Sequence, residues 1–383
     1  MVQKLKFSPP SYTNKEKEAV IECISNSWTG SGPKLSEFEN NFREYKEISS
    51  AAGFSSCTSA IFLALKSLGI KEGDEVITTA MTFCSTVNCI IHCGAKPILC
   101  DIDPITKNIC PDEILKKITH KTKAIIPVHY AGFPCEMDTI MNISKEKELY
   151  VIEDCAHAIE SKYKNQHCGT FGEIGCFSFY ATKNIAIGEG GMAISENPRL
   201  ISKMSTLGLH GLSRDAWRRF EHSQKSSYDV IEIGYKMNLT DIHSAIGIVQ
   251  LSRIDEMYQR RKEIWKYYNE ELKDTDISLP ANCIDEGNVH AMHLYAVGLP
   301  SYLDRNEVVW KSSKEENIIF GVHYNSIPSF TAYKNYFDFE DPSKDFENAW
   351  EWGKKTISLS ISAGVSDTDC ERIIKCIKSF LKK

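Results

Sequence analysis

The sequence lacks any apolar run of about 18 residues, the length that a membrane-spanning helix requires. Its first ten residues lack the apolar core of a signal peptide. It also lacks an excess of positive charge, because the net charge is −6, and this offers no general attraction for nucleic acid or anionic membranes. These absences predict a cytoplasmic protein with neither nucleic acid nor membrane as a partner. An anionic substrate would need locally placed cations.

Paired metal-ligand motifs are also missing. The fourteen cysteines are scattered through apolar runs, and no CxxC pair is matched by a second pair or by histidines. Cysteine often serves as a small hydrophobe in a reduced compartment. We therefore expect buried thiols, no metal and no hydrolase centre built on Cys, His and Asp ligands.

Strand-like and helix-like segments alternate from residue 55 to residue 154. The strand patterns are 75–79, 96–101, 123–129 and 149–153, and the helical patterns are 61–68, 83–92, 111–118 and 138–146. Two earlier helices are expected over 15–27 and 35–46. This alternation predicts an α/β fold with a mainly parallel sheet between helices, whose active site lies beyond the carboxyl ends of the strands.

The pattern changes towards the C-terminus. A polar, irregular stretch over 209–232 predicts a loop that is functional or reaches a partner. A long helix is then expected from Thr240 to about Leu272, followed by strands over 290–298 and 318–324 and helices over 305–315 and 367–381. We expect a large domain over 1–250 and a small α+β domain over 251–383.

One lysine stands out at the end of a buried, aromatic-rich strand. Lys183 follows the run from Cys176 to Tyr180 and precedes a glycine cluster. Burial there would lower the pKa of its amine, as a nucleophile requires, although most lysines are solvated surface residues. A second buried strand ends on Asp154. A lysine for a Schiff base and an aspartate for a pyridinium nitrogen are the pair that pyridoxal 5′-phosphate (PLP) needs.

Other residues suit the remaining parts of the same cofactor. Thr58 and Ser59 lie in a Ser/Thr-rich helix start, which could bind a phosphate or be a plain N-cap. Ser178 could add a phosphate contact or be structural. Phe83 could stack on the ring or lie in the core, and His157 could position a phenolic oxygen or the aspartate, or be an interior histidine. Together in one βα framework they favour the cofactor site.

The sequence resembles the DegT/DnrJ/EryC1/StrS family of sugar-nucleotide aminotransferases, a branch of the fold-type I PLP enzymes. The resemblance runs from Thr29-Gly30 to the last helix. It rests on seven blocks, at 55–60, 73–77, 126–132, 152–157, 177–191, 210–211 and 234–241. The blocks at 128–132 and 234–242 are most similar to the branch that makes a nucleotide-linked 4-amino-4-deoxy-L-arabinose.

The resemblance implies a role for each matching position. Lys183 would bind PLP and shuttle the proton, Asp154 would hold the pyridine nitrogen protonated, Thr58, Ser59 and Ser178 would bind the phosphate, and Phe83 would stack on the ring. His157 would also contact the cofactor. Asn238 would reach the phosphate of the neighbouring subunit's cofactor, which implies a homodimer with its active site at the interface. Thr29, His323 and Tyr324 would lie near the substrate.

The implied reaction moves an amino group from L-glutamate to a nucleotide-linked keto sugar, at C4, for an amino sugar of a surface glycan or a similar product. Two alternatives stay open: a 3-keto-sugar aminotransferase with the same machinery, and a sensor or regulator that uses the fold without catalysis. The second would be expected to lack Lys183 or Asp154, and both are present. Many relatives have arginine where Asn238 stands and asparagine where Lys236 stands, which leaves the exact sugar nucleotide open.

Overall fold

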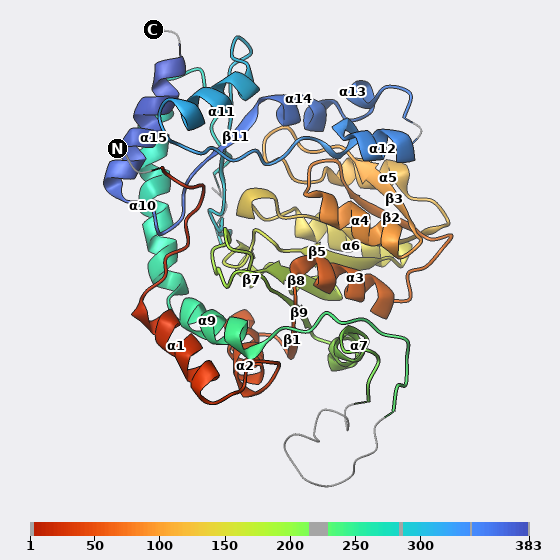
Figure 1. Ribbon diagram of the computed structural model, residues 1–383. Coiled ribbons are helices and arrows are strands. Elements are labelled where there is room, and N and C mark those ends of the chain that lie inside the picture. Colours follow the sequence, from red (N-terminus) through yellow and green to blue (C-terminus); the bar gives the residue numbers. More distant parts are fainter. Residues whose placement is uncertain (1–3, 214–228, 283–285, 338, 382–383) are drawn as a thin grey trace.

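The computed structural model describes residues 4–213, 229–282, 286–337 and 339–381, and its centre is a seven-stranded sheet (Figure 1). The strand order is β1-β9-β8-β5-β4-β2-β3. The strands are β1 (Ser50–Phe54), β2 (Glu75–Thr79), β3 (Lys96–Cys100), β4 (Thr122–Ile126), β5 (Tyr150–Asp154), β8 (Ile174–Ser178) and β9 (Gly191–Ser195).

Pairing within the sheet is mostly parallel. Strands β3, β2, β4, β5 and β8 form parallel pairs, and β9 is antiparallel to both of its neighbours, β8 and β1. The chain therefore leaves β1, β2, β4, β5 and β8 at the same edge of the sheet. The predicted α/β architecture with a mainly parallel sheet is confirmed.

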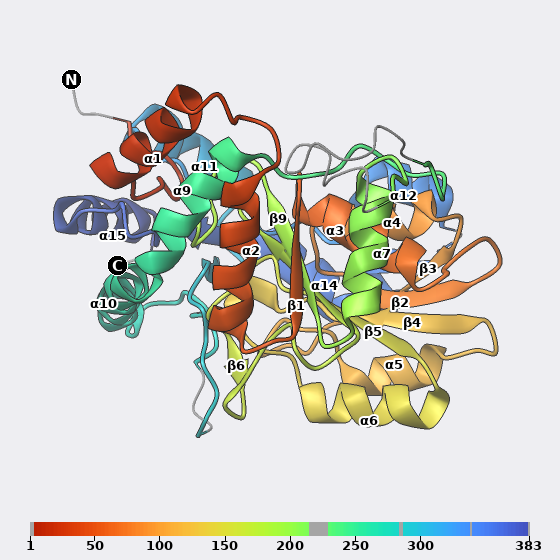
Figure 2. The same ribbon diagram turned by 90° about the horizontal axis from the view of Figure 1, so that it is seen from below.

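Helices cover both faces of the sheet, as its buried strands require. Figure 2 shows α3 (Cys57–Ser67), α4 (Cys84–His92) and α7 (Pro198–Gly208) on one face, and α5 (Pro111–Lys117) and α6 (Met137–Lys147) on the other. The α2 helix (Pro33–Lys46) packs through Phe38 and Phe42 against Phe177 and Phe179.

The C-terminal part builds a second apolar core. The α10 (Ile254–Leu272), α11 (Arg305–Lys314) and α15 (Asp367–Phe380) helices pack around the antiparallel pair of β10 (Tyr295–Gly298) and β11 (Thr356–Leu359). Leu5 joins this core and bridges to Ile318. The other elements are α1 (Asn14–Ser25), η1 (Tyr130–Gly132), β6 (Lys162–Tyr163), β7 (Gln166–His167), α9 (Asp241–Ser252), η3 (Ile327–Ser329), α12 (Thr331–Tyr336), α13 (Pro342–Asp345) and α14 (Glu347–Lys355).

The single long helix expected from Thr240 to Leu272 is wrong. The backbone leaves helical geometry at Arg253 (φ −109°, ψ 9°), so α9 and α10 are separate and meet at an angle (Figure 1). The Arg253 guanidinium is held by the carboxylate of Glu16 at 3.0 Å and by the carbonyl oxygen of Ser11. A contact with the distant N-terminal segment thus accompanies the break, and helical periodicity does not report it.

Two predicted strands of the C-terminal part also differ. Only Tyr295–Gly298 of the stretch 290–298 is a strand, because Ala291 and His293 donate their N–H groups to Gly132 and Ala131 instead. Residues 318–324 make isolated bridges and no strand. Residues 214–228 of the predicted loop at 209–232 lie outside the described residues. Among the helices of the described chain, none has the length and apolar character needed to cross a bilayer.

Candidate active site

The carboxyl edge of the sheet opens into a cavity of about 510 Å³. Its walls come from the segments that follow β1, β2, β4, β5 and β8, together with residues 323–324 of the C-terminal part. Eight residues predicted from the sequence line it: Thr58, Phe83, Asp154, His157, Ser178, Lys183, His323 and Tyr324. Residues from segments that are far apart in the sequence thus line one cavity.

Lys183 lies in the turn that follows β8, where its backbone N–H donates to the carbonyl of Tyr180 at 2.8 Å. Burial lowers the pKa of its amine to about 8, against the raising influence of the Cys57 thiol and the Asp154 carboxylate. An amine with this pKa is partly neutral near pH 7, so it can act as a nucleophile or a base.

Asp154 ends β5 and is buried at the floor of the cavity. Its two oxygens accept hydrogen bonds from the Ala156 N–H at 3.1 Å and the Thr86 hydroxyl at 2.8 Å. Burial nevertheless raises its pKa above the usual range, against those bonds and the nearby Lys183 amine. A cationic partner in the cavity would therefore stabilise the ionised form of this carboxylate.

The start of α3 forms the opposite, anion-attracting side. Ser56 caps the helix by accepting the N–H of Ser59 at 3.0 Å, and Thr58 in the first turn is exposed to the cavity. Gly191 packs against this turn so closely that an added Cβ would lie 2.4 Å from the carbonyl carbon of Ser56. Free N–H groups, hydroxyls and the helix dipole suit a phosphate here.

Ser59 takes a different place from the one expected for a phosphate ligand. Its hydroxyl is buried and bonds to the hydroxyls of Ser55 at 2.9 Å and Ser56 at 3.0 Å. Ser56 lines the cavity in its stead.

Aromatic and imidazole rings form the remaining wall. Phe83 is 56% exposed, so its face is available to a flat ligand, and its ring centroid lies 5.9 Å from that of Tyr324. His157 accepts the Ala131 N–H through Nδ1 and bonds through Nε2 to the Tyr324 hydroxyl at 2.8 Å. Burial, and then the Lys183 amine, lower the pKa of His157 well below its usual value, which keeps this ring neutral.

Among the residues at the site that were not predicted, His293 lies beside the lysine. His293 lies in the segment docked on Ala131, and its Nε2 is 3.5 Å from the Lys183 amine. In the sequence it is one of two histidines, with His290, in an apolar stretch, and such histidines are more often core residues than site residues. Only the packing of the C-terminal part on η1 brings it to the lysine.

Thr29 and Asn238 lie apart from this cavity. Asn238 lines a second cavity of about 760 Å³ together with Gly30 and Lys236, and its amide donates to the Ser31 hydroxyl at 2.5 Å. Thr29 is exposed beside Gly30. Within one chain, these two predicted residues are therefore not brought to Lys183.

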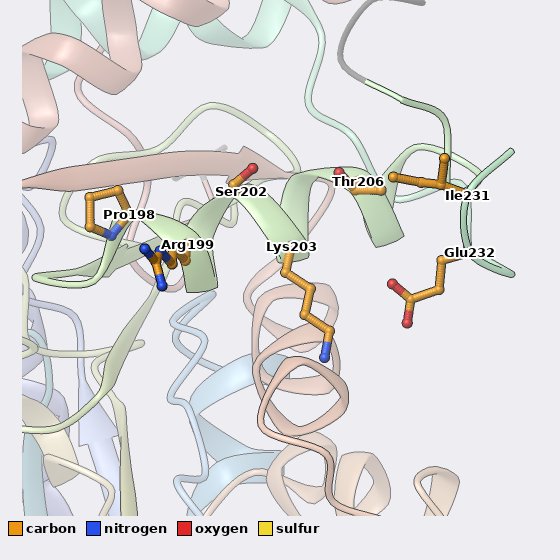
Figure 3. Close-up of a pocket in the computed structure, with 7 residues that line it drawn as sticks. All are labelled: Pro198, Arg199, Ser202, Lys203, Thr206, Ile231 and Glu232. Atoms are coloured by element: carbon orange, nitrogen blue, oxygen red, sulfur yellow. The ribbon is translucent and has the colours of Figure 1, made fainter. Parts of the chain in front are cut away.

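Two other features carry no catalytic arrangement. His129, Glu153 and Cys155 cluster as metal ligands might, but both Glu153 oxygens accept backbone N–H groups at 2.7–3.0 Å, and His129 bonds to Glu153 and to the Cys135 N–H. A surface hollow of about 440 Å³ beside α7 is lined from Pro198 to Thr206 and by Ile231 and Glu232 (Figure 3). None of the predicted site residues lines it.

Comparison with known proteins identifies the family. The profile of the DegT/DnrJ/EryC1/StrS aminotransferase family matches residues 10–378. The chain belongs to this family.

Relatives of this family match over almost their whole length. The spore coat polysaccharide biosynthesis protein SpsC of Bacillus subtilis is 38% identical over 389 residues, which cover 100% of this chain and 99% of SpsC. An uncharacterised protein of Methanocaldococcus jannaschii is 42% identical over 379 residues, 98% of this chain and 97% of its own.

Solved structures of the family have the same fold. Spr1654 of Streptococcus pneumoniae, described as a sugar aminotransferase and solved in its PMP form, superposes with a TM-score of 0.90 at 30% identity, covering 98% of this chain and 97% of its own. Helicobacter pylori PseC, an aminotransferase involved in the biosynthesis of pseudoaminic acid, gives a TM-score of 0.89 at 26% identity, covering 99% of this chain and 99% of its own. The predicted aminotransferase fold is confirmed.

Proposed function

We propose that the protein is a PLP-dependent aminotransferase that moves an amino group from L-glutamate to C4 of a nucleotide-linked keto sugar. The observation that supports this most is the meeting, in one cavity, of the Lys183 amine, the Asp154 carboxylate and the start of α3. The polysaccharide role of SpsC and the amino-sugar pathway of PseC support a sugar substrate and a glycan product.

The residues present fit PLP at each of its ends. The buried Asp154 carboxylate, with its raised pKa, suits the pyridinium nitrogen. The first turn of α3, with Thr58 and Ser178, suits the phosphate, and the glycine at 191 leaves the turn room to approach. Phe83 offers an exposed ring face for stacking. His157, held by Tyr324, would lie beside the ring.

When bound, PLP supplies the electron sink that lets a carbon–hydrogen bond next to the amine be broken. The chain's own part is binding, orientation and proton transfer. Lys183 Nζ, with its pKa lowered to about 8 by burial, can be neutral when it must accept a proton and can give it back. Burial lowers the pKa of both His157 and His323, so their rings are neutral and add no positive charge to the cavity.

The proposed homodimer explains why Asn238 lies apart from Lys183 within one chain. In the proposal, Asn238 completes the phosphate site of the partner subunit, and Thr29 reaches the partner's substrate. The segment before Asn238 carries exposed apolar side chains, with Val230 51%, Ile231 63% and Ile233 88% exposed. Such side chains are expected to be covered by a second copy.

Subunit complementation tests this arrangement together with the activity. Lys183→Ala and Asn238→Ala chains are each expected to be inactive with glutamate and a keto sugar. Mixed after reversible dissociation, they form dimers in which one site has Lys183 from one chain and Asn238 from the other. About a quarter of wild-type activity should return. No recovery from verified mixed dimers would contradict a shared site, and full activity of Lys183→Ala alone would contradict the aminotransferase.

The first half-reaction tests the amino donor separately. With bound PLP and no keto sugar, glutamate should yield about one equivalent of 2-oxoglutarate per chain and then stop. Continuous production, or none, would contradict the proposal. Screening nucleotide-linked 4-keto and 3-keto sugars then decides the position of the new amine.

A further inference from the structure

A chain of polar side chains runs from the Lys183 amine to a buried ion pair on α10. His293 Nε2 lies 3.5 Å from Lys183 Nζ, and His293 Nδ1 lies 2.9 Å from the side-chain oxygen of Asn184. The Asn184 amide donates to Glu160 at 2.7 Å, and the other oxygen of Glu160 accepts from Arg261. Its members come from four separate stretches of the chain.

The far end of this chain is fixed. Glu160 and Arg261 are both buried, with 6% and 2% of their side chains exposed, and they form an ion pair. A buried carboxylate in such a pair holds its orientation strongly, because breaking the pair leaves an uncompensated charge. Glu160 therefore always presents an acceptor to the side chain of Asn184.

The orientation of the Asn184 amide follows from its acceptors. Its nitrogen faces two groups that can only accept, the Glu160 carboxylate and the carbonyl oxygen of Ala291 at 3.1 Å. The amide must place its NH₂ group there, so its oxygen faces His293.

This orientation decides the tautomer of His293. Because the Asn184 oxygen can only accept, His293 Nδ1 must carry the hydrogen. Burial, and then the Lys183 amine, lower the pKa of His293 well below its usual value, so the ring is neutral. Its Nε2 then carries no hydrogen, and the lone pair of this nitrogen faces the amine of Lys183.

We propose that His293 is a positioning residue for Lys183: its Nε2 accepts a hydrogen bond from the lysine amine and, through Asn184, Glu160 and Arg261, holds that amine in place. The proposal rests on the function proposed above, in which Lys183 is the reacting amine. Other titratable groups line the same cavity as this amine; they are Cys57, Asp154, His157, Tyr180, Glu189, His323 and Tyr324.

The expected effect is on the protonation of Lys183. Accepting a hydrogen bond stabilises the ammonium form, so His293 holds the pKa of Lys183 above the value that burial alone would give. Replacing His293 by leucine removes the acceptor and adds apolar surface. The midpoint for the amine should fall from about 8 by about one pH unit.

The test measures the amine itself, in the full-length chain freed of PLP. The rate of Lys183 acetylation by acetic anhydride is followed against pH by peptide mass spectrometry. His293→Leu should lower the midpoint, and His293→Gln, which can place an oxygen near the Nε2 position, should restore most of it. Asn184→Ala, which removes the group that fixes the tautomer, should lower it as well and serves if His293→Leu does not fold.

His290→Gln is the matched control, since His290 is a buried neutral histidine three residues away that packs on Trp265 and does not contact Lys183. Its midpoint should equal that of the wild type. An unchanged midpoint in His293→Leu, or an equal shift in His290→Gln, would overturn the proposal.

A kinetic readout separates positioning from substrate binding. In the PLP-loaded enzyme, His293→Leu should lower kcat for the glutamate half-reaction with little change in KM, whereas a general loss of structure would alter both. The acetylation result does not depend on bound PLP. If the wild-type protein has no aminotransferase activity but His293→Leu still shifts the acetylation midpoint, the proposed function is refuted and the contact between His293 and Lys183 stands. A normal midpoint in an active enzyme would refute the contact alone.

Discussion

Asp154→Asn should lower activity while leaving the cofactor-free protein as stable as before, or more so. The asparagine can keep both hydrogen bonds of the carboxylate: its oxygen can accept from Ala156, and its NH₂ group can donate to the Thr86 hydroxyl. The substitution therefore removes a charge and little else.

The loss of function follows from the missing counter-charge. Removing one partner of a buried ion pair costs about 3–5 kcal/mol, and each 1.4 kcal/mol is about tenfold in a rate or an affinity. If Asp154 pairs with the pyridinium nitrogen, the glutamate half-reaction of the variant should slow by about 10²-fold to about 4 × 10³-fold. Stopped-flow absorbance with saturating PLP measures it.

The stability change has the opposite sign. Burial raises the folded-state pKa of Asp154, so its carboxyl contributes stability that is full below the unfolded pKa and is lost as pH rises through the folded pKa. Above that pH range the buried, ionised carboxylate destabilises the folded protein, and an asparagine at this position does not. This cost grows once Lys183, with a pKa of about 8, becomes neutral.

Urea unfolding of the cofactor-free wild type and variant, at about pH 6 and about pH 9, tests this sign. The variant should gain relative to the wild type as pH rises. A variant that is less stable by about 3 kcal/mol at the higher pH, or a half-reaction of wild-type speed, would refute the reasoning.

Three further predictions concern the supports of the site. Gly191→Ala should weaken PLP binding by tenfold or more in equilibrium dialysis, since its Cβ would lie 2.4 Å from the carbonyl carbon of Ser56; wild-type affinity would contradict this. Burial raises the pKa of Glu16, but hydrogen bonds from Thr13 and Gln250 outweigh it and lower that pKa to about 2. The ionised Glu16 should therefore stabilise the folded protein above about pH 4.5, and this stabilisation should vanish towards about pH 2. Glu16→Gln should accordingly lower Tm at about pH 7 and leave Tm unchanged near about pH 2. Lys46→Met should destabilise the fold by about 2–4 kcal/mol in urea, because its buried amine donates to two carbonyl oxygens; an unchanged midpoint would count against those bonds.

Local patterns in the sequence were enough to predict the parallel core. The strands at β2, β3, β4, β5 and β8 follow from short apolar runs between helical patterns. The carboxyl-edge rule then brings Asp154, Ser178 and Lys183 together, because neighbouring parallel strands end at the same edge.

Features that depend on distant contacts could not be predicted in this way. Arg253 leaves the helix where its side chain binds Glu16, more than two hundred residues earlier. The stretch 290–294 reads as a strand, but it docks on Ala131 and Gly132 and so carries His293 to the lysine. A histidine in an apolar stretch, with His290 three residues earlier, gives no local signal of its contact with Lys183.

The central claim is that Lys183 is the lysine that binds PLP, and reductive trapping tests it most directly. The PLP-loaded protein is treated with borohydride and its peptides are analysed by mass spectrometry, with and without prior addition of L-glutamate. The account predicts a pyridoxyl-phosphate adduct on Lys183 that disappears when glutamate is added first. An adduct on another lysine, or one on Lys183 that glutamate leaves unchanged, would contradict it.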